Sequence, residues 1–443
     1  MRRTPKSKAL WERAAKWSPL GVHSNYRFVE PYPFYVQRSK GVHIWDADGI
    51  DYLDFNMAFG SLQSGHAHPK VVAALQRQIG EGSVYGYEWE HTPAIAERIC
   101  RRFGTAKLRF STTGLEATHH ALRMARAYMG RPYVLKFEGC YHGSHDTLLV
   151  GVKPTAEAAG PAHRPHSVPA GPGLLPDVVG KTLVAPFNDL DAVREIIREH
   201  ANDLAAVIAE PIPMNMGFIL PDPEFFPGIR ELCDEVGALL IFDEIKTGAK
   251  YLHGGAGRLG VKPDMLTLGK SIASGVPLSV ITAREGIMDK VGPRRVAHAG
   301  TYNSNPLAMA AARVCLDEIL TEEALDRSTS LNRQLARGYE EVLHDAGVTA
   351  IVSADGVSGT VYFTDHPVRN WRDFLTVDGD RSILYYYLGL NHNLIPSGTG
   401  PDEQWTLSVQ HTEADVAKHL EILSNYAPKL VGKPVAGEIE ESV

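Results

Sequence analysis

Short apolar runs alternate with stretches of helical periodicity through the middle of the chain. Four runs have the length and composition of buried strands, at residues 133–137, 205–212, 238–245 and 265–269. Apolar residues recur at the spacing of one helix face in the segments 114–130, 190–200 and 223–237. This alternation predicts an α/β fold with a mostly parallel sheet covered by helices. Ligands of such sheets bind beyond the carboxyl ends of the strands.

The two ends of the chain have a different pattern. Residues 41–55 alternate apolar and polar positions on both sides of a turn at Ala47-Asp48-Gly49, which predicts a β-hairpin. After about residue 310 the pattern changes to a helix, short strands and a last helix at 413–427. We therefore expect a large domain over 61–310, and a smaller α+β domain made of an N-terminal segment, 1–60, and a C-terminal part, 311–443.

The stretch 143–182 is rich in glycine, proline and alanine and shows little periodicity. A loop of this length inside a compact domain is usually functional or mobile. The segment is expected to be a lid over an active site, and the alternative is a plain surface excursion.

Composition and charge exclude several classes of function. The formal net charge of −7 lacks the basic footprint of a nucleic-acid-binding protein and argues against an anionic membrane surface. The apolar runs are strand-length, and the N-terminus has no apolar core of a secretory signal. The four cysteines are far apart, which is typical of free thiols in a reducing compartment. We expect a cytoplasmic protein that acts on small molecules, with neither nucleic acid nor membrane as a partner.

Lys270 is the next-to-last residue of the sequence "DMLTLGKS", which resembles the end of a phosphate-binding P-loop. That motif requires glycine five residues before Gly269, and Asp264 stands there. The loop would lack its first turn, so nucleotide hydrolysis is not expected. A lysine at a strand end is otherwise usually solvated. A functional role for Lys270 is therefore indicated only in combination with a second residue.

That second residue is Asp243, at the end of the apolar run "LLIFDEIKTG". A carboxylate at the end of so apolar a strand is costly unless it is paired. A protonated pyridine nitrogen is one partner, because pyridoxal phosphate (PLP) requires a lysine and an acidic residue at its ring nitrogen. A strand-end cap and a metal ligand are the alternatives. Since no cluster of histidine or cysteine supports a metal, no metal is expected.

Two further segments carry candidate chemistry. A strand enters Thr113-Gly114 and a helix leaves at Leu115, so free amides at the helix N-terminus suit a phosphate, although an ordinary N-cap is an equal alternative. Tyr141 follows another strand and can stack on an aromatic ring. The next residue, His142, forms an H-x-x-H pair with His145, but these are expected to be loop residues rather than metal ligands.

Together these motifs resemble the class III aminotransferases, which are fold-type I PLP enzymes. The resemblance runs from about residue 22 to 411 through "IWDADG", "GHAHP", "TTGLEAT", "KFEGCYHG", "IFDE", "PDMLTLGK" and "HAGTYNSNP". Within the family the chain is most similar to glutamate-1-semialdehyde 2,1-aminomutase and β-amino acid transaminases. The resemblance implies that the large domain over 61–310 binds PLP.

The resemblance also implies residue roles. Lys270 matches the Schiff-base lysine, Asp243 the carboxylate at the pyridine nitrogen, and Tyr141 the stacking aromatic. The remaining cofactor-binding matches are Thr113, Gly114 and Leu115 at the phosphate, His142 beside Tyr141, Asn215 near the ring, and Thr301, which reaches the phosphate of the neighbouring subunit of a homodimer. Arg27 and Phe59 match substrate-binding positions.

Some positions depart from the family pattern. The usual Ser-Gly-Thr phosphate turn is Thr113-Gly114-Leu115, so one hydroxyl donor is lost. Phe59 stands where the aminomutase has tryptophan. The segment 395–412 lacks both a clear match to the aminomutase glutamate and the arginine of many ω-amino acid transaminases, so Arg27 is the best candidate to bind a substrate carboxylate.

The expected reaction is transamination between an amino acid, which could be a β-amino acid, and a keto acid, with Lys270 as the proton carrier. Three alternatives remain on the same residues. They are the intramolecular amino transfer of an aminomutase, a PLP-dependent racemase or epimerase, and a PLP-binding protein without catalysis.

Overall fold

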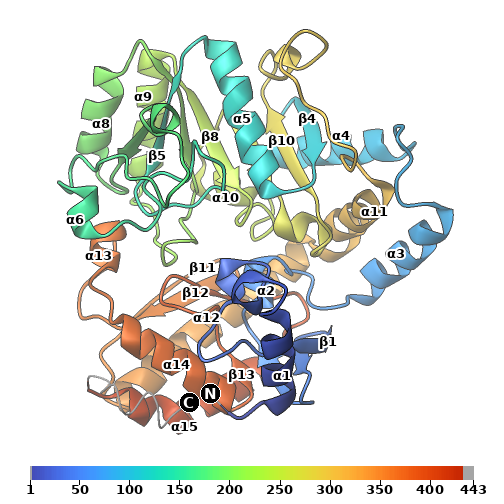
Figure 1. The fold of residues 1–443 in the computed structure, drawn as a ribbon, viewed down its shortest axis with the longest axis vertical. Coiled ribbons are helices and arrows are strands. Elements are labelled where there is room, and N and C mark those ends of the chain that lie inside the picture. Colours follow the sequence, from blue (N-terminus) through green and yellow to red (C-terminus); the bar gives the residue numbers. More distant parts are fainter. Residues whose placement is uncertain (1, 433–443) are drawn as a thin grey trace. The chain divides into compact units, whose positions relative to one another are not determined.

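The computed structural model describes residues 2–432 and divides into two compact units, traced by sequence colour in Figure 1. Among the described residues, unit 1 contains 2–69, 326–367 and 377–432. Unit 2 contains Lys70–Leu325 and the short segment Val368–Thr376. The C-terminal part of the chain thus contributes to both units.

Unit 2 is built on a seven-stranded sheet with the order β4-β10-β9-β8-β7-β5-β6. The strands are β4 (Lys107–Ser111), β5 (Tyr133–Phe137), β6 (Thr182–Ala185), β7 (Leu204–Ala209), β8 (Leu239–Glu244), β9 (Met265–Leu268) and β10 (Ser279–Ala283). Only β10 is antiparallel to its neighbours β4 and β9, and all other pairs are parallel. The predicted α/β fold with a large, mostly parallel sheet is confirmed.

Helices cover both faces of this sheet. The helical elements of unit 2 are α3 (Pro69–Glu81), α4 (Thr92–Phe103), α5 (Gly114–Met129), α6 (Ala156–Ala159), α7 (Pro176–Val179), α8 (Leu190–Glu199), α9 (Phe225–Val236), α10 (Gly254–Leu259), η3 (Lys270–Ala273), η4 (Met288–Lys290), α11 (Pro306–Val314), η5 (Cys315–Ile319) and α13 (Trp371–Phe374). Strands β5, β7, β8 and β9 and helices α5, α8 and α9 lie where the hydrophobic pattern predicts them, within a few residues at each end.

The alternation of side chains along β8 decides which residues face which helix layer. Ile241 packs in one core cluster with the buried side of α5, whereas the Phe242 ring packs against Phe226 of α9. Because the side-chain period of a strand is two, Asp243 continues the face that carries Ile241, and Glu244 continues the opposite face. Two adjacent carboxylates therefore leave the sheet on opposite sides.

The segment 143–182 contains the single-turn helices α6 and α7 and is fastened within unit 2 by the short segment 368–376. The Trp371 indole N–H donates to Pro154 O (2.8 Å), and the Arg372 guanidinium donates to Gly160 O (3.0 Å). Arg372 also forms an ion pair with Glu138 (2.9 Å), whose carboxylate is nearly inaccessible to solvent. The 368–376 segment is therefore an integral part of the packing of unit 2.

Unit 1 has two small sheets, with the orders β1-β2-β3-β13 and β11-β12-β14. Its elements are α1 (Pro5–Ala14), η1 (Pro19–Gly21), η2 (Asn25–Arg27), β1 (Val36–Lys40), β2 (His43–Asp46), β3 (Asp51–Asp54), α2 (Met57–Gly60), α12 (Glu322–Asp345), β11 (Ile351–Asp355), β12 (Ser358–Tyr362), α14 (Gly379–Asn391), β13 (Leu394–Ile395), β14 (Trp405–Thr406), α15 (Glu413–Tyr426) and η6 (Ala427–Leu430). The predicted hairpin is confirmed as β2 and β3. The hydrophobic core of unit 1 includes the stacked rings of Tyr339 and Trp405.

All four cysteines lie in the described part of the chain and are free thiols. Among residues 2–432, no helix combines the length and the apolarity needed to cross a bilayer.

Candidate active site

Asp243 lies at the carboxyl end of β8 and is held there by three groups. The Thr267 hydroxyl donates to Asp243 Oδ1 over 3.0 Å, and the Ile245 amide donates to the same oxygen over 3.1 Å. The other oxygen, Oδ2, lies 2.8 Å from His142 Nδ1. Only 5% of Asp243 is exposed, so these contacts fix the orientation of a buried carboxylate.

His142 connects Asp243 to the loop after β5. Its side chain is fully buried, and its Nε2 atom has no hydrogen-bond partner among the described residues. Because Asp243 accepts, Nδ1 carries a proton. The His142 carbonyl accepts a 2.6 Å hydrogen bond from the Thr118 hydroxyl of α5. A buried polar atom without a partner beside a buried carboxylate is unusual and marks a place where a polar group of a ligand is expected.

Lys270 follows β9, the strand next to β8. The parallel register pairs Glu244 with Leu268, the last residue of β9, so Lys270 lies two residues beyond the end of the sheet. Its backbone φ is +49°, in the left-handed region that residues other than glycine seldom adopt. Strain of this kind costs about 1–2 kcal/mol and persists where the surrounding structure imposes it, often at functional sites. The side chain is half-buried.

Tyr141 is half-buried in the loop after β5, and burial raises the pKa of its phenol. Asn215 lies beside it, since Asn215 Nδ2 is 3.4 Å from Tyr141 O. Both residues also bind Glu210, at the end of β7. Glu210 Oε1 accepts from the Tyr141 amide (3.2 Å), and Oε2 accepts from Asn215 Nδ2 (3.0 Å) and the Met214 amide (3.1 Å). Glu210 therefore organises two loops around the predicted site.

The Thr113-Gly114-Leu115 turn forms the N-terminus of α5. Thr113 is the N-cap of a capping box, in which its hydroxyl accepts from the Glu116 amide and the Glu116 carboxylate accepts from the Thr113 amide. The ordinary N-cap is therefore present. The amides of Gly114 and Leu115 have no acceptor within the helix, because the first turn lacks preceding carbonyls. An anion can still bind at these two amides.

Gly143 explains how the loop of His142 approaches this turn so closely. Its φ is +100°, and a Cβ atom there would lie 2.9 Å from Leu115 Cα. Only glycine fits, so the backbone after His142 packs directly on the α5 turn. The sequence-predicted residues of unit 2 that these contacts bring together are Asp243, Tyr141, His142, Asn215 and the Thr113–Leu115 turn, with Lys270 at the adjacent strand end.

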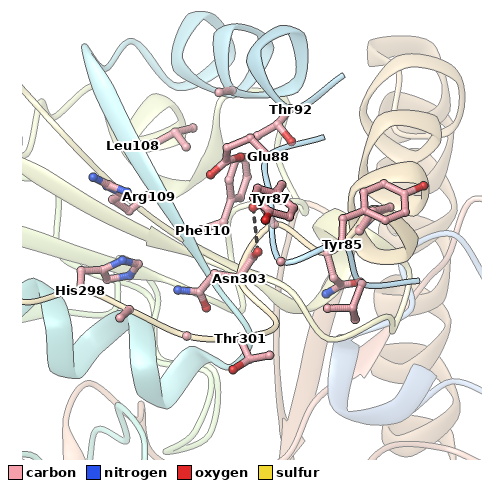
Figure 2. A pocket seen from close by; sticks show the side chains of 18 residues that line it. Tyr85, Tyr87, Glu88, Thr92, Leu108, Arg109, Phe110, His298, Thr301 and Asn303 are labelled. Carbon is pink, nitrogen blue, oxygen red and sulfur yellow. Dashed lines mark hydrogen bonds between the residues drawn. The ribbon is translucent and has the colours of Figure 1, made fainter. Parts of the chain in front are cut away.

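Thr301 lies in a different place. It is exposed and lines a hollow of about 720 Å³ together with Tyr85, Tyr87, Arg109 and His298, as Figure 2 shows. The residues that contact Asp243 do not line this hollow. Within one chain, Thr301 is therefore separate from the Asp243 cluster.

Arg27 and Phe59 belong to unit 1. Arg27 ends the short helix η2 with an exposed side chain, and Phe59 lies half-buried in the α2 turn with a φ of +58°. The rings of Tyr26 and Phe59 meet edge to face, with centroids 6.4 Å apart. The two predicted substrate residues therefore come from neighbouring segments of the same unit.

Cys140, His142 and Glu210 offer three potential metal-ligand atoms within 4.8 Å of one another. Both Glu210 oxygens already accept N–H groups, and His142 Nδ1 is engaged by Asp243. The group thus forms a hydrogen-bonded scaffold.

Several further residues support the site, among them Glu244 and Glu210, whose positions at strand ends favoured a structural role from the sequence alone. Glu244 is fully buried, and its carboxylate accepts from the amides of Gly255 (2.6 Å) and Ala256 (2.8 Å) and from the Thr247 hydroxyl (3.1 Å). Burial raises the pKa of Glu244 to about 7. Thr267 and Lys136 also support the site, and the sequence did not single them out. A polar residue inside an apolar run was the available signal, but its partners are distant in sequence.

Comparison with known proteins decides the family. The family model for aminotransferase class III matches residues 26–393, more than four-fifths of the chain. The chain belongs to the class III aminotransferases. It is therefore an enzyme of a family that uses PLP as its cofactor, and the resemblance found in the motifs is confirmed.

Individual members of the family resemble the chain over nearly its whole length. Glutamate-1-semialdehyde 2,1-aminomutase from Methanopyrus kandleri is 37% identical over 97% of this chain and 98% of the relative. The crystal structure of an omega-transaminase from Sphaerobacter thermophilus is 31% identical with a TM-score of 0.90, covering 96% and 98% of the two chains. A β-phenylalanine aminotransferase from Variovorax paradoxus is 30% identical with a TM-score of 0.83, covering 95% and 93%.

Proposed function

We propose that the protein is a transaminase that transfers an amino group from an amino acid, with β-amino acids as the favoured class, to a keto acid. The observation that carries the proposal is the placement of Lys270 beyond β9, next to the β8 end where three groups hold Asp243. A lysine and a fixed carboxylate on adjacent strand ends are what a PLP enzyme requires. Similarity to transaminases with solved structures supports the donor class.

The residues present fit PLP on several observations. Lys270 supplies the amine for covalent attachment, Asp243 a carboxylate for the pyridine nitrogen, and the amides of Gly114 and Leu115 an anion site for the phosphate. The buried Nε2 atom of His142 lacks a partner among the described residues, as expected beside a ligand. When bound, PLP supplies a protonated pyridine ring that accepts the electron pair left on the substrate carbon.

The side chains of this chain then have distinct tasks. Lys270 Nζ would accept the proton from the amine-bearing carbon of the substrate and deliver it to the C4′ atom of the cofactor. Thr267 and His142 hold Asp243, whose carboxylate would bind the ring nitrogen. Tyr141 would stack on the ring, and Asn215 is held beside Tyr141 through Glu210. Arg27 is proposed to bind the substrate carboxylate in a bidentate manner, with Phe59 beside it.

A homodimer is part of the proposal, because Thr301 would complete the site of the neighbouring subunit. Its exposed position in the hollow of Figure 2 supports this role. Mixing inactive Lys270→Ala and Thr301→Ala chains tests it. In a hybrid dimer one site receives both intact residues, so activity is expected to reappear on mixing. If it does not, Thr301 acts within its own chain or not at all. We place the dimer in the cytoplasm, which the free thiols support.

An aminomutase is the second candidate function, and the 37% identity to the Methanopyrus kandleri enzyme favours it. The name of that enzyme describes an isomerisation within one molecule, for which no separate amino donor is needed. The Phe59 and 395–412 departures from the aminomutase pattern weigh against it, and for these reasons the transaminase is proposed first.

The deciding experiment presents the PLP-loaded enzyme with one amine at a time in the absence of a keto acid. Single α- and β-amino acids and glutamate-1-semialdehyde are compared by the visible absorbance of the cofactor. A transaminase converts the cofactor to its aminated form with an amino acid alone, and a subsequent keto acid restores it. A response to glutamate-1-semialdehyde alone assigns the aminomutase, and an absorbance unchanged in Lys270→Ala refutes the site.

A further inference from the structure

Lys136 is a buried lysine near the end of β5 that the proposed reaction does not use. Its side chain has no exposed surface, and it lies on the sheet face that packs against α5, because Val134 on the same strand face belongs to that core. Its Nζ atom donates to Cys140 O (2.7 Å) and Val150 O (2.6 Å) and lies 3.4 Å from Leu148 O. One ammonium therefore joins both ends of the loop 140–150.

The charge state of Lys136 matches this arrangement. Burial lowers the pKa of Lys136 to about 8, so the side chain is mainly an ammonium at neutral pH. An ammonium has three N–H donors and no acceptor, and three carbonyl oxygens surround it. Hydrogen bonds from a charged donor are stronger than those between neutral groups.

Glu210 holds the same loop from the other side. Its Oε1 atom accepts from the Tyr141 amide at 3.2 Å. The Tyr141 N–H and the Cys140 C=O belong to one planar peptide unit and point in opposite directions across it. A buried cation thus binds one edge of this peptide and a buried anion binds the other.

This pairing determines the rotation of the peptide plane. If the plane turned over, the Cys140 carbonyl would face the Glu210 carboxylate and the Tyr141 N–H would face the Lys136 ammonium. Both encounters are repulsive in a buried site, where electrostatic interactions are strong. The peptide plane therefore has one favoured orientation. This orientation determines the direction of the backbone that follows, and hence the positions from which the side chains of Tyr141 and His142 extend.

We propose that Lys136 and Glu210 are positioning residues, which fix the Cys140–Tyr141 peptide and thereby orient Tyr141 and His142 toward the cofactor. The part of this inference that concerns the cofactor rests on the proposed PLP site. Neither residue touches the reacting atoms in this scheme. Lys136 acts through the loop, and Glu210 acts through the Tyr141 amide and Asn215.

The first test uses the cofactor-free protein, so that it does not depend on the proposed function. Hydrogen exchange of the Tyr141 amide is measured in wild type and in the variants Lys136→Met and Glu210→Gln. Methionine keeps the length of the side chain without donors, and glutamine keeps an acceptor without charge. Loss of a charge-assisted buried hydrogen bond predicts exchange about ten- to a hundredfold faster. Unchanged exchange in both variants overturns the proposal.

The second test uses the PLP-loaded enzyme and reports on the cofactor. The visible circular dichroism of bound PLP and its dissociation constant are measured with kcat and KM. We expect an altered dichroism band, weaker PLP binding and a fall in kcat that exceeds the change in KM. Because both residues act on one peptide, the effects in the double variant should be smaller than the product of the single effects.

Two controls separate positioning from general stability. Lys181→Met removes an exposed lysine, and Asp264→Asn disturbs a buried ion pair with Arg230 at the opposite end of β9. Asp264→Asn should lower the melting temperature without altering the dichroism of bound PLP. If Lys136→Met and Glu210→Gln show the same behaviour as Asp264→Asn, their roles are only structural. If Lys136→Met does not fold, Glu210→Gln and Lys136→Arg decide, with arginine expected to retain part of the wild-type dichroism.

If the wild-type protein shows no absorbance band of bound PLP, the proposed function fails. The hydrogen-exchange experiment still tests whether Lys136 and Glu210 fix the Cys140–Tyr141 peptide.

Discussion

Thr267 and Asp243 stand opposite each other on the parallel strands β9 and β8, and the Thr267 hydroxyl donates to Asp243 Oδ1 over 3.0 Å. The strand register itself therefore supplies a donor to the carboxylate. Within unit 2 this places the support for Asp243 on the strand that leads to Lys270.

Replacing Thr267 by valine tests this relationship. Valine has nearly the same shape but no hydroxyl, so Asp243 Oδ1 keeps only the Ile245 amide. We expect kcat to fall by about tenfold and PLP to bind less tightly, because a buried charge-assisted hydrogen bond is lost. Steady-state kinetics and PLP titration measure both effects. Thr267→Ser retains the hydroxyl and should keep most of the activity, and equal losses in both variants would contradict the assignment.

His142 is expected to matter through its Nδ1 atom. In His142→Asn, the amide nitrogen lies near the position of Nδ1 and can still donate to Asp243, whereas His142→Phe keeps a ring without a donor. We predict that phenylalanine lowers kcat by about ten- to a hundredfold and that asparagine lowers it less. The order of the two variants in kcat and in PLP affinity is the measurement. A larger loss with asparagine than with phenylalanine would assign importance to the ring shape instead.

Leu115 offers a gain-of-binding prediction. Threonine at this position restores a hydroxyl donor to the turn at the N-terminus of α5, where the phosphate is proposed to bind. One added hydrogen bond to an anion should lower the PLP dissociation constant by about threefold to tenfold. Leu115→Ala is the control, since it shortens the side chain without adding a donor. Equal affinities for the threonine and alanine variants would argue against a phosphate at this turn.

Glu244 predicts a dependence of stability on pH. Its ordinary pKa is 4.5, and burial raises the pKa to about 7 in the folded protein. The folded state therefore binds more protons between these values, so the stabilisation is complete below pH 4.5 and is lost as pH rises through 7. The contribution is about 3 kcal/mol in the free energy of unfolding.

Urea unfolding at several pH values measures this effect. Glu244→Gln stays neutral, so its stability relative to wild type should increase as pH rises from about 5 to about 8. The exposed Glu224→Gln should follow wild type throughout. A constant difference between Glu244→Gln and wild type would show that Glu244 does not titrate in this range.

The sequence predicted the central residues of the candidate site because strand ends carry local signals. Asp243 and Lys270 each follow an apolar run, and parallel strands bring their carboxyl ends to one edge of a sheet. Tyr141 follows a third such run. The pattern of apolar runs was therefore enough to predict the fold class and to select these three positions. The family resemblance then supplied the expected roles of the three residues.

Other features required the three-dimensional structure. Lys136 is one polar residue in an apolar strand, and its partners are carbonyl oxygens, which leave no trace in a sequence. The sequence did not indicate that Arg372 binds Glu138, because 234 residues separate the two. Thr301 was assigned by resemblance, and a single chain places it in a hollow away from Asp243.

The contact between Glu138 and Arg372 also has a consequence for the order in which the protein is made. Strand β5 and Glu138, which follows it, leave the ribosome long before Arg372 is synthesised, yet the guanidinium is the partner of this buried carboxylate. A nascent chain that ends before residue 368 lacks the last segment of unit 2. Unit 2 therefore cannot reach its final packing while its main segment is being translated. A chain truncated after residue 325 lacks the partner of Glu138 and is not expected to replace the whole protein.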